Sequence, residues 1–173
     1  MIIGADSTDA VPANPLWTFS LSLYRREGVA DLCLDLQDRL GLDVNLVLYA
    51  AFAAARGVSV GSEDLAAVEA TILHWRDSIL RPLRLLRRQL QDSGDERDAR
   101  RALLSAELAL EQVQQSRMWE ARQPAGDWPA AANELPVRGN LAALARHAAI
   151  DEGELEALAS ALEHLLPALL AEL

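Results

Sequence analysis

One segment of the chain, residues 44–56, is apolar on nearly every side. Gly41 before it favours the end of a preceding helix, Asp43 can accept a hydrogen bond from the first turn, and Gly57 ends the segment. A helix that is apolar all round is buried on every side, and this one is shorter than the ~20 residues that span a bilayer. The segment therefore predicts a buried central helix and no membrane insertion.

The neighbouring segments show the three- and four-residue spacing of amphipathic helices. Asn14 followed by Pro15 favours an N-cap and a first helical residue, and Pro82 is expected to kink or break the long segment in which it lies. The sequence holds no alternating pattern of the kind that half-buried strands require. The spacing predicts helices over residues 14–26, 29–40, 62–91 and 96–122.

A Pro-rich stretch, residues 124–136, separates these helices from a C-terminal part. We expect a surface loop there, then a short helix that Asn140 caps, then a last helix that Asp151 and Glu154 begin with a capping box. The fold class is therefore expected to be all-α, a compact irregular bundle of six or seven helices with a buried apolar central helix. We expect a single helical domain over residues 1–173, with a main bundle at 14–122, the loop at 124–136 and a C-terminal helical pair at 137–173.

The charge balance narrows the expected partners. All 16 basic residues are arginines, against 26 acidic residues, and the net charge is −10. Nucleic acid is not an expected partner, because that affinity comes mainly from basic groups on phosphates. Cys33 is the sole cysteine, which excludes an intrachain disulfide, and residues 1–13 lack the basic and apolar regions of a signal peptide. We therefore expect a cytoplasmic protein.

Half of the arginines lie in residues 76–101. Helical spacing gathers five of them on or near one face, opposite an apolar stripe that we expect to be buried. Guanidinium groups bind carboxylates and phosphates with paired hydrogen bonds, so this face predicts a site for an acidic partner or an anion. The alternative is internal pairing with acids such as Glu107 and Glu111. The arginines are Arg76, Arg81, Arg84, Arg87 and Arg88, and the stripe is Ile79, Leu83, Leu86 and Leu90.

A second hypothesis rests on Asp31, Asp35 and Asp38, whose spacing places three carboxylates on one helical face. Such a face can bind a metal ion that carries a diphosphate, or it can simply be solvated. Asn45 is unusual inside the apolar helix, where its amide needs hydrogen-bond partners, either as part of a ligand site or near the helix start. These four residues form the alternative ligand site, in a small-molecule-binding or metal-dependent helical enzyme.

Catalytic motifs are not recognisable in the sequence. No Glu stands three residues before His74, His147 or His164, as a di-iron bundle requires, and neither a phosphate loop nor an HExxH pair occurs. A non-catalytic role without cofactor or bound metal is therefore favoured. Trp119 precedes the Pro-rich loop and Trp128 lies within it, and these two side chains can anchor an interface or pack the loop onto the bundle.

Several motifs together resemble a known family. Asn14-Pro15-Leu16-Trp17, the segment Cys33-Leu34-Asp35-Leu36-Gln37-Asp38, the helix start Asp43-Val44-Asn45-Leu46, and Trp75-Arg76 with Leu83-Arg84-Leu85-Leu86-Arg87-Arg88 are similar to the pattern of a family of bacterial conserved hypothetical proteins, a domain of unknown function. The resemblance covers about residues 14–120. It implies a cytoplasmic helical protein and names no substrate, cofactor or catalytic residue.

The favoured hypothesis is a non-catalytic cytoplasmic interaction or regulatory protein. It binds an acidic partner or an anion through the Arg-rich helix face, with Trp128 as a further contact. The partner is an unknown protein, and apolar helix faces leave a homodimer open as well. Reversal of charge at Arg84 and Arg88 is expected to abolish partner capture.

Overall fold

The central helix of the protein is α3, Val44–Ala55. In the computed structural model, which describes residues 14–122, 128 and 134–172, eleven of its twelve residues are buried. Asp43 caps it, because its carboxylate accepts a hydrogen bond of 2.8 Å from the Asn45 N–H. The prediction of a buried central helix is confirmed.

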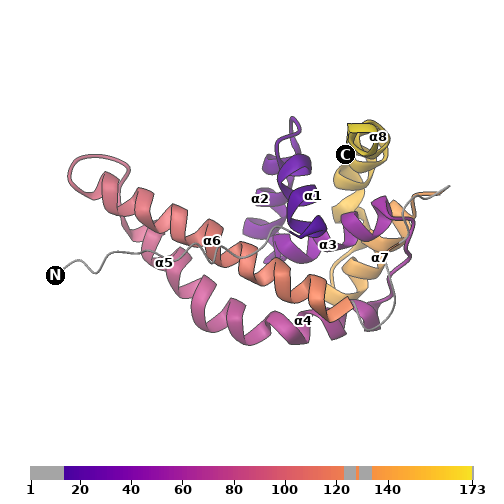
Figure 1. Cartoon of the computed structure of the whole chain (residues 1–173), viewed down its shortest axis with the longest axis horizontal. Helices are drawn as coiled ribbons and strands as arrows, with labels where there is room; N and C mark the ends of the chain where they lie inside the picture. Colours follow the sequence, from indigo (N-terminus) through magenta and orange to yellow (C-terminus); the bar gives the residue numbers. More distant parts are fainter. Residues whose placement is uncertain (1–13, 123–127, 129–133, 173) are drawn as a thin grey trace.

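Helices surround α3 on several sides, and the all-α fold class is confirmed. Figure 1 shows α5 and α6 extending to the left as an arm, while α1, α2, α3, α7 and α8 gather on the right. Asn14 caps the first helix, since its side-chain oxygen accepts from the Trp17 N–H at 2.9 Å. The helices are α1 Pro15–Tyr24, α2 Val29–Leu40, α4 Ser62–Trp75, α5 Arg81–Gln89, α6 Glu96–Arg122, α7 Val137–Ala148 and α8 Glu156–Glu172, with a π-helical turn at Arg76–Leu80 and a 3₁₀ turn at Glu152–Leu155.

One apolar core joins the first and the last of the described helices. Phe19 of α1 meets Phe52 of α3 edge to face at 5.3 Å between ring centroids, and α7 and α8 add leucines to the same cluster. The expected C-terminal helical pair therefore shares a core with the main bundle. The core includes Leu16, Phe19, Tyr49, Phe52, Ile72, Met118, Leu144 and Leu162.

The long helix that contains Pro82 is neither regular nor broken. It runs from α4 through the π-helical turn into α5, and the Arg81 N–H donates to the carbonyl of Arg76, five residues back. In a regular helix a proline ring clashes with the carbonyl four residues before it. A π turn bonds residues five apart and so widens the helix at that point. The predicted kink or break is thus a π turn.

Two sequence predictions are wrong. Asn140 does not cap a helix, because α7 begins at Val137 and Asn140 lies inside it, 1% exposed. Its amide donates to the carbonyls of Ala50 and Val58, and its oxygen accepts from the Val60 N–H at 3.0 Å. The expected buried stripe is not buried at any of its four positions: Leu86 is 48% exposed, and Ile79, Leu83 and Leu90 are half-buried, because α5 contacts the molecule mainly through α6 and the π turn.

Two predictions fall on residues that the structure does not describe. They concern residues 1–13, where we expect no signal peptide, and most of residues 124–136, where we expect a Pro-rich loop. Within the described part of the chain, no helix has the length and apolar character needed to cross a membrane.

Candidate binding pockets around Arg84

Ion pairs hold together α5 and α6, the two helices of the arm. Arg84 Nε lies 3.0 Å from a carboxylate oxygen of Glu107, and its Nη2 donates to Glu111. Arg87 also pairs with Glu107. The side chains of Arg84 and Arg87 are only 15% and 18% exposed. These contacts correspond to the internal pairing that the sequence left open as an alternative.

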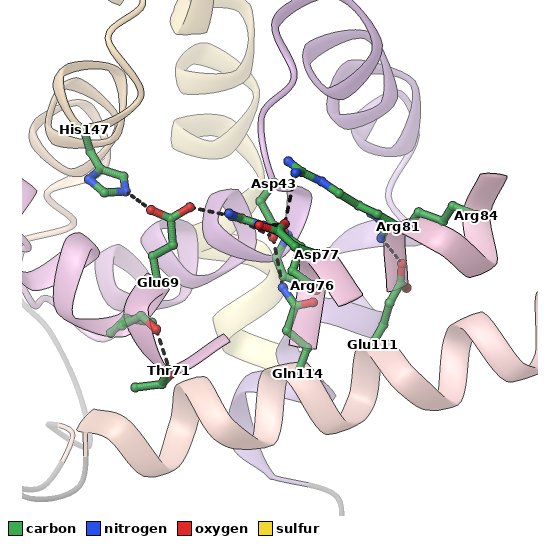
Figure 2. A network of polar contacts seen from close by, with 12 residues as sticks. Asp43, Glu69, Thr71, Arg76, Asp77, Arg81, Arg84, Glu111, Gln114 and His147 are labelled. Atoms are coloured by element: carbon green, nitrogen blue, oxygen red, sulfur yellow. Dashed lines mark hydrogen bonds and ion pairs between the residues drawn. The ribbon is translucent and has the colours of Figure 1, made fainter. Parts of the chain in front are cut away.

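Arg76 belongs to a buried polar network at the π-helical turn. Figure 2 shows Glu69 between His147 and Arg76, with Arg76 reaching on to Asp43 at the start of α3. Gln114 of α6 donates to the same Asp43 at 3.0 Å. The network links α3, α4, α6 and α7. Arg76 pairs with several carboxylates within it and so has a structural role.

Arg81 and Arg88 are the accessible members of the arginine face. Their side chains are 57% and 54% exposed, and each makes one exposed ion pair, with Asp77 at 3.0 Å and Asp38 at 3.4 Å. Exposed pairs of this kind contribute about 0–1 kcal/mol, so an incoming anion can displace them at little cost.

These two arginines line a pocket of about 300 Å³ between the α2–α3 turn and the α4–α5 rod. We call it the arginine pocket. Its lining holds four guanidinium groups and two carboxylates. Arg76 and Arg84 are also paired with carboxylates outside the lining, whereas the pairs of Arg81 and Arg88 are exposed. Its charged residues are Asp38, Asp43, Arg76, Arg81, Arg84 and Arg88.

A second pocket of about 340 Å³ lies on the other side of Arg84, between α1, α2, α3, α5 and α6. We call it the leucine groove. Two arginines and two glutamates, already paired with each other, balance the charge of its lining. The apolar part consists of Trp17, Leu21, Leu34, Val44, Leu48, Leu104 and Leu108, and the polar part includes Ser20, Asn45 and Gln115.

Burial shifts the pKa of two titratable groups in the wall of the leucine groove. Burial raises the pKa of Glu111, although Arg84 opposes the shift. Burial also raises the pKa of the Tyr24 hydroxyl to about 12, with smaller contributions from Cys33 and Glu111.

The alternative ligand site does not come together as one cluster. Asp31 and Asp35 are exposed and line neither pocket, whereas Asp38 lines the arginine pocket and Asn45 the leucine groove. The described residues contain no group of three or more His, Cys, Asp or Glu side chains that could hold a metal ion.

Four other aromatic side chains, Trp119, Trp128, His74 and His147, line neither pocket. Trp128 stacks on Trp119 at 6.0 Å between ring centroids and meets Phe52 at 4.9 Å, so it packs onto the bundle. His147 joins the polar network through Glu69 at 2.9 Å, and His74 contacts Ser78.

Sequence reasoning missed most of the leucine groove. Ser20 and Gln115 come from different helices, and no spacing within either helix signals that they meet near Asn45. Gln115 Nε2 donates to Asn45 Oδ1 at 2.8 Å, so the amide noticed in the sequence has a partner 70 residues away. The signal in the sequence was the amide of Asn45 in an apolar helix, because a buried amide requires a hydrogen-bond partner.

The fold and these pockets define an all-helical bundle with two adjacent pockets and no recognised catalytic constellation in the described residues. The chain belongs to the family described as "Protein of unknown function (DUF2390)", which matches residues 15–118. No curated protein and no solved structure matches the chain. The matched segment contains every residue named above in the two pockets.

Proposed function

We propose that this is a non-catalytic cytoplasmic interaction or regulatory protein, which binds an anionic group of its partner in the arginine pocket. The supporting observation is that Arg81 and Arg88, both more than half exposed, flank a pocket lined by four arginines and two aspartates. Carboxylate and phosphate groups match the two-pronged geometry of guanidinium donors.

The roles of the arginines differ in this proposal. Arg81 and Arg88 exchange weak surface pairs for contacts with the anion, whereas Arg84 keeps its bonds to Glu107 and Glu111 and forms part of the pocket wall. Charge reversal at Arg84 would bring an extra carboxylate against two others, so it tests folding as much as binding. Arg81 and Arg88 are therefore the better test positions.

The test compares pyrophosphate and an octaglutamate peptide as probes in calorimetric titrations. The wild-type protein should bind at least one of them with an affinity that falls as salt rises. The double variant Arg81→Glu/Arg88→Glu should lose about tenfold or more in affinity, because two guanidinium contacts each contribute about 1 kcal/mol or more.

The matched control is Arg97→Glu/Arg101→Glu, which reverses two exposed arginines near the start of α6, outside the arginine pocket. It changes net charge by the same amount. Equal loss of affinity in both double variants would show a general charge effect and contradict the proposal, as would the absence of binding by the wild-type protein.

A further inference from the structure

Two polar atoms in the wall of the leucine groove lack hydrogen-bond partners. Among the described residues nothing bonds to Ser20 Oγ or Gln115 Oε1, although both side chains are almost fully buried, at 2% and 1% exposure. An unsatisfied buried polar group costs about 1–3 kcal/mol. Both side chains line the groove, so a rotation of either one would present its oxygen as an acceptor to a molecule bound there.

The groove also exposes apolar surface on opposite walls. Leu34 of α2 is 45% exposed, and Leu104 and Leu108 of α6 are 42% and 50% exposed. All three line the groove, so a molecule placed there would bury them together. Apolar area removed from water contributes about 25 cal/mol per Å², and this supplies the main driving force for an occupant.

The charges of the lining decide the class of occupant. Arg84 and Arg87 are already paired with Glu107 and Glu111, so the lining has no excess of either sign. An ion entering the groove would lose hydration without gaining an unpaired counter-charge. This distinguishes the leucine groove from the arginine pocket, where the pairs of Arg81 and Arg88 are exposed and weak enough for an anion to displace.

We propose that the leucine groove binds a small, uncharged, mainly apolar molecule that donates an O–H or N–H hydrogen bond to Gln115 Oε1 or Ser20 Oγ. The proposal does not rest on anion binding in the arginine pocket, although Arg84 lines both pockets. Its volume of about 340 Å³ fits small-molecule sites, which commonly span about 300–1,000 Å³. A second copy of the chain fits less well, because stable protein interfaces bury about 1,600 Å² in total.

Indole is the first probe, because it is apolar, uncharged and carries one N–H donor. The matched probe is 1-methylindole, which keeps the ring and lacks the donor. Titration of the full chain, followed by leucine methyl resonances in NMR spectra, should give saturable shifts at Leu34, Leu104 and Leu108. Binding of 1-methylindole should be about fivefold weaker or more, corresponding to the loss of one hydrogen bond to a buried acceptor.

Variants locate the site on the protein. Leu108→Lys places a charge in the groove and should abolish the shifts at Leu34 and Leu104. Leu73→Lys is the control, because Leu73 is 47% exposed on α4 and does not line the groove. If Leu108→Lys does not fold, Leu34→Lys makes the same change from the opposite wall.

Three results would overturn the proposal. One is the absence of saturable shifts in the groove, and another is equal affinity for the two probes. The third is sedimentation that shows a wild-type dimer and a monomeric Leu108→Lys variant, since the groove would then be the interface between two copies.

Discussion

Asn140 links the segment after the central helix to α7 through one buried amide. It bonds to the Val60 N–H and to the carbonyls of Ala50 and Val58, so it satisfies backbone groups where α3 ends and the chain turns toward α4. Polar groups at such buried turns have little access to water. A residue that sequence spacing assigned to a helix cap is instead a tertiary connection.

Replacement of Asn140 by leucine should therefore be costly. Asn140→Leu leaves the Val60 N–H buried without this acceptor, and we expect the free energy of unfolding in urea to fall by about 3 kcal/mol. The control is Arg146→Ala in the same helix, which removes an exposed ion pair with Glu152 and should cost less than about 1 kcal/mol. Similar losses in both variants would contradict the assigned role.

Glu69 gives the polar network a predictable dependence on pH. Burial acts to raise its pKa, but the ion pairs with Arg76 and His147 outweigh burial and hold the pKa below the usual 4.5. The unfolded chain thus binds the proton more readily than the folded protein. The stabilisation is present above about pH 4.5 and is lost as pH falls through the lower pKa of the folded state.

Glu69→Gln should remove this contribution. Urea unfolding between about pH 3 and pH 7 should show that the variant loses less stability on acidification than the wild-type protein. Glu63→Gln, an exposed position at the start of the same helix, is the control and should follow the wild-type curve. Parallel curves for Glu69→Gln and wild type would rule out the network as the origin of the pH effect.

At the scale of elements, α5 differs from the helices around it. None of its residues is buried, and Leu85 and Leu86 are 60% and 48% exposed. Its stability rests on the π-helical turn before it and on the pairs of Arg84 and Arg87 with α6. Helices with few buried apolar contacts open more easily than core helices.

Removal of Glu107 should release α5 selectively. Hydrogen exchange of the full chain should show amides of residues 81–89 exchanging about tenfold faster in Glu107→Ala, while α3 keeps its protection. Glu120→Ala changes an exposed acid farther along α6 and should leave α5 unchanged. Unaltered exchange in α5 would mean that apolar contacts, rather than ion pairs, hold the arm.

The sequence predicted those features of each helix that neighbouring residues determine, namely its caps and its extent. Asn14 and Asp43 act as caps, and residues 96–122 form one helix, because caps and apolar spacing act within a few residues. The π turn at Arg76–Leu80 and the exposure of Leu86 depend on which neighbour α5 meets. The leucine groove could not be predicted from the sequence, because its walls come from five helices.

The whole molecule depends on helices that lie beyond the family match. The match ends at residue 118, yet α7 packs on α3 and α4, and α8 packs on α2, α3 and α7. Leu141, Leu144 and Leu162 from this pair are almost fully buried in the common core. The central helix is apolar on every side, so without α7 and α8 part of it would face water.

A chain ending at residue 122 should therefore fail to form the native bundle, although it contains both pockets. We expect it to keep helical circular dichroism but to lose cooperative thermal unfolding, because exposed core surface favours a loosely packed state. The full chain and the Leu73→Lys variant serve as folded controls. Added separately, residues 134–173 should restore a cooperative transition only if they dock on α3. A truncated chain that unfolds as cooperatively as the full chain would instead make residues 14–122 a self-sufficient domain and the C-terminal helical pair an accessory to it.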